Sequence, residues 1–169
     1  MRLFTNLEFK SLEDLFVKQL EDLYDAETRL VDAIPKMVQA ASTPELKRAL
    51  EDHWAQTQQH VQRLDAIFQQ LGREPESETC EAMKGLINEG EEVVSAQGDA
   101  DVKDAAIIAA AQRVEHYEMA GYGTVRTFAR RLGFEKLAGL LQTTLEEEAA
   151  ADRKLTQIAE RQVNIRAVS

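Results

Sequence analysis

The chain has 169 residues, a formal net charge of −10 and a single cysteine, with hydrophobic residues at 44% and aromatic residues at 6%. Its length is enough for one domain with a sizeable core. The excess of acid argues against nucleic acid as a partner, because the phosphate backbone is also negative. One cysteine excludes a disulfide framework and a thiolate metal cluster, as expected for a reducing cytoplasm. No secretion signal and no run of about 18 apolar residues occurs, so we predict a cytoplasmic chain that does not contact membranes.

Helix-favouring residues dominate the sequence, and no alternating pattern typical of a β-strand occurs. The first predicted helix covers about 12–41, with Ser11 as its N-cap. A kink or break is predicted at Pro35, which cannot donate a helical hydrogen bond. Glu27 occupies one position of the apolar face. The other members of that face follow the 4-3 spacing of a helix that buries one side: Leu12, Phe16, Leu20, Leu23, Leu30, Ile34 and Met37.

The second predicted helix covers about 45–71. It follows a Ser-Thr-Pro turn at 42–44, in which the proline suits a first helical position, and Gly72 suits the end of the helix. Both His53 and His60 lie on its apolar face. The rest of this face keeps the same 4-3 spacing: Leu46, Leu50, Thr57, Leu64, Ile67 and Leu71.

Two further long helices are predicted at about 102–132 and 136–161. Glu118 lies in the centre of the first apolar stripe, and Glu115 lies one turn earlier on nearly the same face. The other residues of this stripe are Ile107, Ala111, Val114, Gly121, Val125, Phe128 and Leu132. Glu148 lies in the second stripe. Its neighbours there are Leu137, Leu141, Thr144, Ala151, Leu155 and Ile158. We expect the tail from Asn164 to be frayed.

The lengths of the connections predict the topology. Short links join the first helix to the second and the third to the fourth, so each pair should be antiparallel. A shorter amphipathic segment at 80–96, interrupted by Gly85 and Gly90, is interpreted as a crossover helix. This long connection allows the second and third long helices to run the same way. The prediction is one all-α domain over 1–169, a ferritin-like four-helix bundle with a short crossover helix between helices 2 and 3.

Each long helix has a polar core residue near its own midpoint: Glu27, His60, Glu118 and Glu148. Because a helix rises about 1.5 Å per residue, side chains near the midpoints lie at one level whichever way the helices run. Three carboxylates and an imidazole in a dry core would repel one another or lack partners without a cation. Carboxylate oxygen and imidazole nitrogen suit iron, which we favour, or manganese or zinc. The pattern therefore predicts a metal site of one or two ions, with Glu115 assisting.

Other interpretations need no metal. Glu27 could be a core acid held by Tyr24 or Arg29. His53 lies two turns from His60, and we interpret it as a hydrogen-bonding neighbour of the site rather than a ligand.

Glu115 could instead pair with Arg126 or Lys103. Three other charged or polar side chains near the predicted site are interpreted as exposed: Glu146, Glu147 and His116. The two nearby tyrosines are interpreted as packing residues: Tyr117 and Tyr122.

Several segments resemble the YciE/YciF family of small bacterial ferritin-like proteins, which have no established enzymatic reaction. These segments are DLYDAE (22–27), CEAMKGLINEGEE (80–92), KDAAIIAAAQRVEHYEMAGYGT (103–124) and LLQTTLEEE (140–148). The resemblance covers nearly the whole chain, and RVEHYE-x-A-x-YG is a specific signature. It implies a four-helix bundle that is often dimeric, is distantly similar to rubrerythrin and is associated with stress responses. Four residues stand where the family has core acids: Glu27, Glu115, Glu118 and Glu148.

The second helix departs from this family pattern. The family commonly has Glu at the position of Gln56 and Gln or His at that of His60, so the resemblance implies a site with one acid fewer. The Glu-x-x-His motif of di-iron carboxylate bundles is absent twice. Thr57 stands three residues before His60, and Ala151 stands three residues after Glu148. This departure weakens the case for oxygen-activating di-iron chemistry.

We predict a cytoplasmic, metal-binding stress-response protein with a di-iron-type or mononuclear centre. If it is an enzyme, a metal-centred oxidation with Fe²⁺ or peroxide as substrate is the reaction to expect, and no catalytic residue is assigned. The alternative is a non-catalytic structural or interaction bundle with a vestigial metal site. The chain is predicted to be a homodimer. Phe4, Leu7 and Phe9 precede the first helix, have no place in a four-helix core, and are expected to cover an interface or the bundle end.

Overall fold

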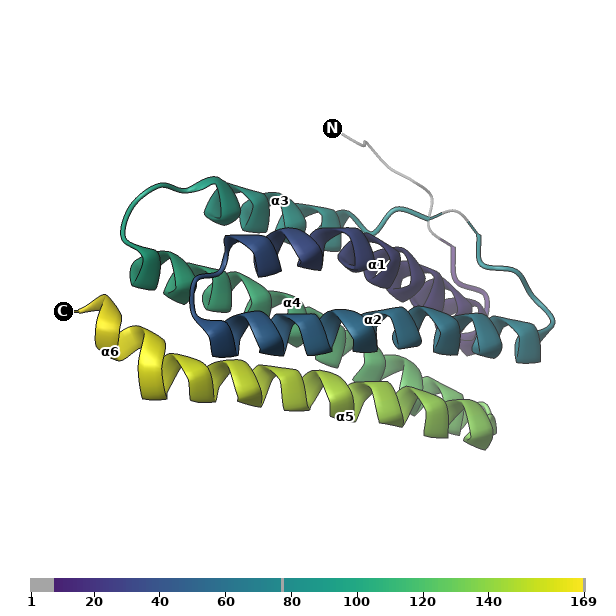
Figure 1. The fold of residues 1–169 in the computed structure, drawn as a ribbon. Coiled ribbons are helices and arrows are strands. Elements are labelled where there is room, and N and C mark those ends of the chain that lie inside the picture. Colours follow the sequence, from purple (N-terminus) through teal and green to yellow (C-terminus); the bar gives the residue numbers. More distant parts are fainter. Residues whose placement is uncertain (1–7, 77, 169) are drawn as a thin grey trace.

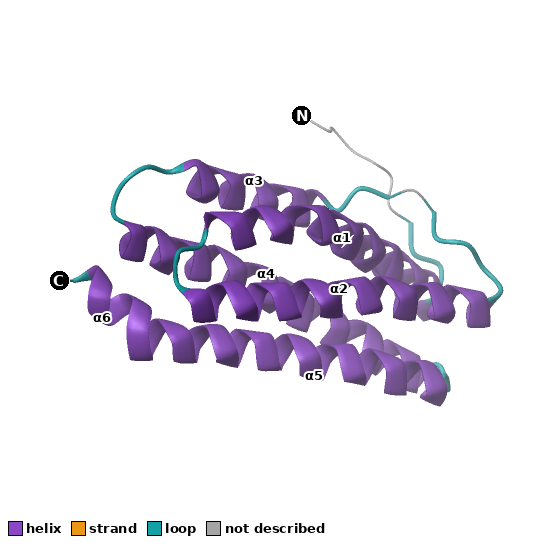
Figure 2. Cartoon of the chain, viewed as in Figure 1, coloured by secondary structure: helices purple, strands orange, loops and turns teal. Residues whose placement is uncertain are grey.

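The computed structural model describes residues 8–76 and 78–168, and its helices form a bundle (Figure 1). Its long helices are α1 (Leu12–Ala40), α2 (Pro44–Leu71), α4 (Ala100–Arg131) and α5 (Glu135–Ile158). A shorter helix, α3 (Glu81–Ser95), connects α2 to α4, and α5 continues into a π-helical turn, η1 (Ala159–Val163), and α6 (Asn164–Ala167). The described residues form helices, loops and turns without a strand (Figure 2), so the predicted all-α class is confirmed.

The order of the helices in space follows the predicted crossover topology. Helix α1 pairs with α2, and α4 pairs with α5; across the bundle α1 also packs on α4, and α2 packs on α5. Helix α3 lies outside this set of four, against α1 and α4. The sequence colours in Figure 1 show that α2 and α4 run in the same direction, and that α1 and α5 run in the opposite one. This is the ferritin-like arrangement with one long crossover.

Helix α1 continues through Pro35, so of the kink or break predicted there, the break does not occur. Proline has no backbone N–H, and the carbonyl of Val31, four residues earlier, therefore lacks its usual helical donor. The indole nitrogen of Trp54 on α2 donates to this carbonyl at 2.9 Å. A side chain of the neighbouring helix thus replaces the hydrogen bond that the proline removes.

The turn between α1 and α2 is fixed by an acid from a distant part of the chain. Thr43, the residue before α2, makes no side-chain capping bond. Instead the buried carboxylate of Asp104 on α4 accepts from the backbone N–H of Ser42 at 2.8 Å and of Thr43 at 2.7 Å. The guanidinium of Arg166 in α6 donates to the Thr43 hydroxyl at 2.6 Å and to Asp101 at 2.8 Å. The expectation of a frayed tail is therefore wrong, because α6 is tied to the start of α2 and α4.

Two apolar clusters fill the bundle, one at each end. The first contains residues from the second half of α1, the start of α2 and α4, and the end of α5, such as Leu30, Leu50, Ile107 and Leu155. The second contains residues from the opposite halves, such as Phe16, Leu64, Val125 and Leu141. On each long helix, buried polar residues lie at or close to the place in the sequence where one cluster ends and the other begins. These residues are Glu27, His53, Thr57, His60, Glu115, Glu118, Thr144 and Glu148; we call them the polar layer.

Of the three apolar residues that precede the first helix, Phe9 lies within the described part of the chain. Phe4 and Leu7 lie outside the described residues. Phe9 is 49% exposed, so it does not pack in the four-helix core of this chain.

Among the described helices, none has the length together with the apolar character that crossing a membrane requires.

Candidate metal centre

The polar layer brings the five predicted metal ligands to the same region of the core. Glu27 comes from α1, His60 from α2, Glu115 and Glu118 from α4, and Glu148 from α5, and all five are buried. Their role as ligands stays a prediction.

His60 lies at the centre of a chain of charged groups. Its Nδ1 atom lies 2.9 Å from a carboxylate oxygen of Glu148 and 3.2 Å from one of Glu27. Its other nitrogen, Nε2, lies 2.9 Å from Glu147, which also accepts from Arg63 at 2.9 Å. When Nε2–H donates to Glu147, Nδ1 is left with a lone pair directed to the side of Glu27 and Glu148. A carboxylate on the second ring nitrogen is the usual support for a histidine that binds metal.

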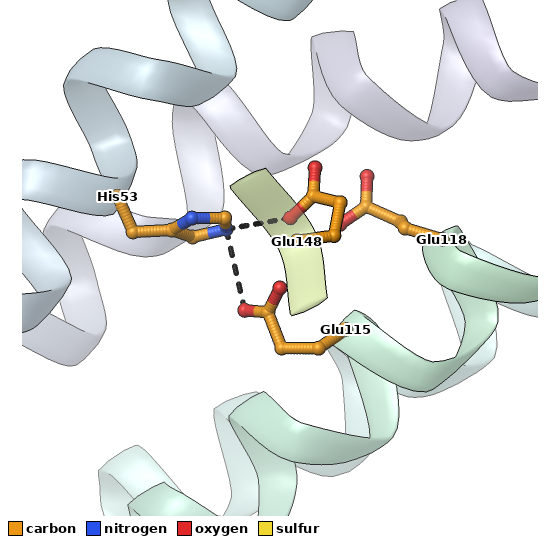
Figure 3. A group of neighbouring side chains, drawn as sticks. All are labelled: His53, Glu115, Glu118 and Glu148. Carbon is orange, nitrogen blue, oxygen red and sulfur yellow. Dashed lines mark ion pairs between the residues drawn. The ribbon is translucent and has the colours of Figure 1, made fainter. Parts of the chain in front are cut away.

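His53 belongs to the same layer, although the sequence analysis placed it beside the site (Figure 3). Its Nε2 atom lies 3.2 Å from a carboxylate oxygen of Glu115 and 3.7 Å from one of Glu148. Glu115 therefore faces His53 and not Arg126 or Lys103, the partners considered from the sequence. In Figure 3 the side chains of Glu115, Glu118 and Glu148 point toward one another from α4 and α5.

Glu27 has a hydrogen-bond donor that the sequence analysis had interpreted as a packing residue. The buried hydroxyl of Tyr122 donates to an oxygen of Glu27 at 2.5 Å. Of the two donors considered from the sequence, Arg29 pairs instead with Asp25. Tyr122 thus fixes one oxygen of Glu27, and the other has no hydrogen-bond partner.

The layer contains more buried acceptors than donors. No hydrogen bond reaches either carboxylate oxygen of Glu118 or of Glu148, and one oxygen each of Glu27 and Glu115 is also without one. His53 likewise makes no hydrogen bond through its ring nitrogens. Buried polar groups in folded proteins are nearly always paired, and an unpaired one costs about 1–3 kcal/mol. So many unpaired atoms in one place indicate a site for a cation.

Electrostatic interactions in the layer shift several pKa values. Burial, reinforced by the charges of neighbouring acids such as Glu148 and Glu27, holds the pKa values of Glu115 and Glu118 well above the usual carboxyl range. Burial alone would lower the pKa of His60, but the close contacts of its Nδ1 atom with the carboxylates of Glu148 and Glu27 overcome this effect and raise that pKa to about 10. Burial likewise opposes ionisation of Glu148, yet the contact with His60 leaves its pKa lowered. Without metal, protons therefore neutralise part of the layer.

The ligand atoms fall into two groups, each compact enough to surround one ion. His53, Glu115, Glu118 and Glu148 form the first group, and within it one atom per residue lies within 4.8 Å of every other. Glu27, His60 and Glu148 form the second group by the same measure. Glu148 belongs to both groups and would therefore supply a ligand to each ion. Oxygen donors with one imidazole in each group suit iron, manganese or zinc, so the residues fit the predicted metals.

Two residues of this region were missed by sequence reasoning. The charge run 146–148 predicts a solvated Glu147, but this residue is half-buried against His60 and Arg63. The distance of two helical turns between His53 and His60 predicts a neighbour of the site, whereas His53 lies within the polar layer. The signal that could have identified it is its place on the apolar stripe of α2, because a buried histidine, like a buried glutamate, needs a partner.

Comparisons with known proteins agree with this architecture. The family described as "Domain of unknown function (DUF892)" matches residues 11–168. Protein YciF of Escherichia coli K12 is 43% identical over 162 residues, which cover 95% of this chain and 98% of YciF. The crystal structure of YciF, described as an E. coli stress protein, superimposes with a TM-score of 0.89 over 92% of this chain and 99% of that one.

Two further solved structures extend the comparison. YcfI from Rhodopseudomonas palustris is 41% identical, with a TM-score of 0.86 over 90% of this chain and 98% of that one. A protein from Xanthomonas campestris pv. campestris, at 22% identity and a TM-score of 0.71 over 89% of this chain and 92% of that one, shares the fold. The predicted resemblance is confirmed: the chain belongs to the DUF892 family and is a relative of YciF.

Proposed function

We propose that this chain is a cytoplasmic metal-binding protein of the stress response, with two adjacent ion positions in the centre of its bundle. One ion is held by His53, Glu115, Glu118 and Glu148, and the other by Glu27, His60 and Glu148. Iron is the metal we favour, with manganese and zinc as alternatives, since all three accept mixed carboxylate and imidazole ligands. The description of its relative YciF as a stress protein supports the physiological part of the proposal.

A single observation supports metal binding most strongly: several buried carboxylate oxygens from three helices converge without hydrogen-bond donors. A structural bundle of this size could replace such acids with apolar residues at no loss of stability, and often with a gain. Acids that served only to pair with one another would also need donors. Tyr122 and His60 contact Glu27, His60 also contacts Glu148, and His53 contacts Glu115. Both oxygens of Glu118 are left without a hydrogen bond. Cations satisfy all of these oxygens at once.

The surrounding residues have definite roles in this proposal. Glu147 holds the ring of His60, and Arg63 holds Glu147. Tyr122 fixes one oxygen of Glu27 and leaves the other to face the ion. Iron or manganese bound here would supply redox chemistry, whereas zinc would not. The apolar clusters on both sides of the polar layer lower the local dielectric constant and so strengthen the attraction between carboxylates and cations.

Metal analysis combined with one bridging variant tests the proposal. Protein stripped with chelator and titrated with Fe²⁺ under anaerobic conditions, or with Mn²⁺ or Zn²⁺, should take up about two equivalents. At a hundredfold excess over the dissociation constant, bound metal should stabilise the fold by about 2.7 kcal/mol, which a thermal melt with and without chelator detects. Glu148→Gln, which alters a ligand of both positions, should lower the stoichiometry and the affinity together.

Glu146→Gln is the matched control, because Glu146 is exposed two residues away on the same helix. It should leave stoichiometry and melting temperature as in the parent protein. Wild-type protein that takes up no metal, with identical melts for loaded and stripped samples, would instead support the non-catalytic structural bundle with a vestigial site.

A further inference from the structure

A pocket of about 220 Å³ opens between α2 and α5 and ends at the polar layer. Exposed Asp52 and Lys154 lie on its wall, and buried His53 and Glu115 form its inner end. Each of these two inner residues has a ring nitrogen or carboxylate oxygen without a hydrogen bond. The first group of candidate ligands is therefore the one that the pocket connects to the surface of the bundle.

The pocket exists partly because a small residue stands at Ala151. Ala151 lies three residues after Glu148 and lines the pocket from α5, opposite Ala49 of α2. In di-iron carboxylate bundles a histidine follows the ligand glutamate at this spacing and projects inward. Alanine has no side chain beyond Cβ, so the space that a histidine would fill remains part of the pocket.

The two ion positions differ in their access to this pocket. His53 and Glu115 of the first position line it. Neither Glu27 nor His60, the residues that distinguish the second position, is among the residues lining it. Both are fully buried between the two apolar clusters. The pocket thus leads to one position and leaves the other enclosed.

We propose that this pocket is the binding site for a small inorganic donor ligand, of the size of azide or peroxide, beside His53 and Glu115. Its volume lies below the range of about 300–1,000 Å³ typical of pockets for organic ligands. At about 30 Å³ for each water molecule, it has room for several waters, and therefore for a ligand of this size. The inference rests on the proposed function: the ligand completes the coordination of the ion at the open position, while the position of Glu27 and His60 takes no external ligand.

Azide titration of the cobalt-loaded protein tests this inference. Co²⁺ is a visible-absorbing substitute for iron or zinc, and azide should change its spectrum with a saturable dissociation constant and a stoichiometry of about one azide per two cobalt ions. Ala151→Leu fills the pocket and should raise the dissociation constant for azide at least tenfold. It should not change the cobalt stoichiometry, because Ala151 supplies no ligand atom.

Two further variants keep the result interpretable. Ala49→Leu fills the same pocket from the facing helix at a half-buried position and should have the same effect as Ala151→Leu. Ala55→Leu adds the same side chain at an exposed position of α2 away from the pocket and should leave azide binding unchanged. Full cobalt loading with azide affinity unaffected in both pocket variants would overturn this inference alone. Failure of the parent protein to bind cobalt would overturn the proposed function together with it.

Discussion

Both carboxylate oxygens of Glu118 are buried and without a hydrogen bond, in the middle of α4. Leucine has a similar volume and no charge, so Glu118→Leu separates the two possible states of the centre. In metal-free protein the substitution removes an unpaired polar group and should raise the free energy of unfolding by about 1–3 kcal/mol. In the presence of metal it removes a ligand and should lower the affinity at least tenfold.

Denaturant titration in chelator measures the first of these effects, and metal titration measures the second. A Glu118→Leu variant with the full metal occupancy and affinity of the parent would show that Glu118 is not a ligand. It would also show that the first group of candidate ligands does not form the metal site.

The raised pKa values in the layer predict how the stability of metal-free protein depends on pH. A group whose pKa is raised by folding stabilises the native state below its unfolded pKa and loses that contribution as the pH rises through its folded pKa. Glu27, Glu118 and His60 all have raised pKa values, that of His60 being about 10. Burial lowers the pKa of His53, so this histidine stays neutral above pH 7. Stability in chelator should therefore fall as the pH rises above 4.5, the ordinary pKa of the acids, and for His60 between pH 6.5 and about 10.

The decrease should amount to at most about 1.4 kcal/mol per pH unit for each proton involved. Glu118→Gln cannot ionise and should reduce the slope, as denaturation midpoints at several pH values will reveal. Equal slopes for the parent and this variant would mean that Glu118 does not titrate in this range.

At the scale of single elements, the hydrogen bond from Trp54 to the carbonyl of Val31 explains how α1 contains Pro35 and remains continuous. Trp54→Phe keeps an aromatic ring and removes the donor, so it should cost about 1 kcal/mol of stability. Pro35→Ala returns a backbone N–H to α1. In the Pro35→Ala background the same Trp54→Phe substitution should therefore cost measurably less.

A double-mutant cycle by denaturant unfolding measures this coupling. If the changes in unfolding free energy of the two substitutions are strictly additive, the indole N–H of Trp54 does not replace the backbone N–H that Pro35 lacks.

At the scale of the whole molecule, we propose that two chains associate. Phe9 is 49% exposed just before α1, and a large apolar side chain at such a place suits contact with a second copy. Light scattering at micromolar concentration should give twice the 19.0 kDa of one chain. Removal of residues 1–10 should weaken this association or lower the melting temperature. A truncated chain with the mass and the melting point of the full chain would remove these residues from the interface.

The polar layer also divides the core of the whole bundle into two apolar clusters. Residues of all four long helices meet in the layer, so metal at this level joins both ends of the bundle. For this reason, loss of metal should lower the stability of the entire chain in one cooperative transition, and not that of a single helix.

The sequence by itself determined the helices and the level of the candidate site. The 4-3 spacing of apolar residues is a local property of each helix, and it identified Glu27, His60, Glu118 and Glu148 as core positions near the helix midpoints. Connection lengths were enough to favour the crossover topology, because two long helices joined by a short link pack antiparallel. These inferences require no knowledge of how neighbouring helices are rotated.

Only the tertiary structure decided which side chains meet within that level. The contact of Glu147 with His60 and that of His53 with Glu115 depend on the rotation and axial offset of α2 against α5 and α4. The pairing of Arg166 with Thr43 joins parts of the chain that are 123 residues apart. Spacing within one helix fixes which face a residue lies on, but packing between helices fixes what that face touches. The partners of the buried acids, and the pocket beside Ala151, therefore appear only when the helices are assembled.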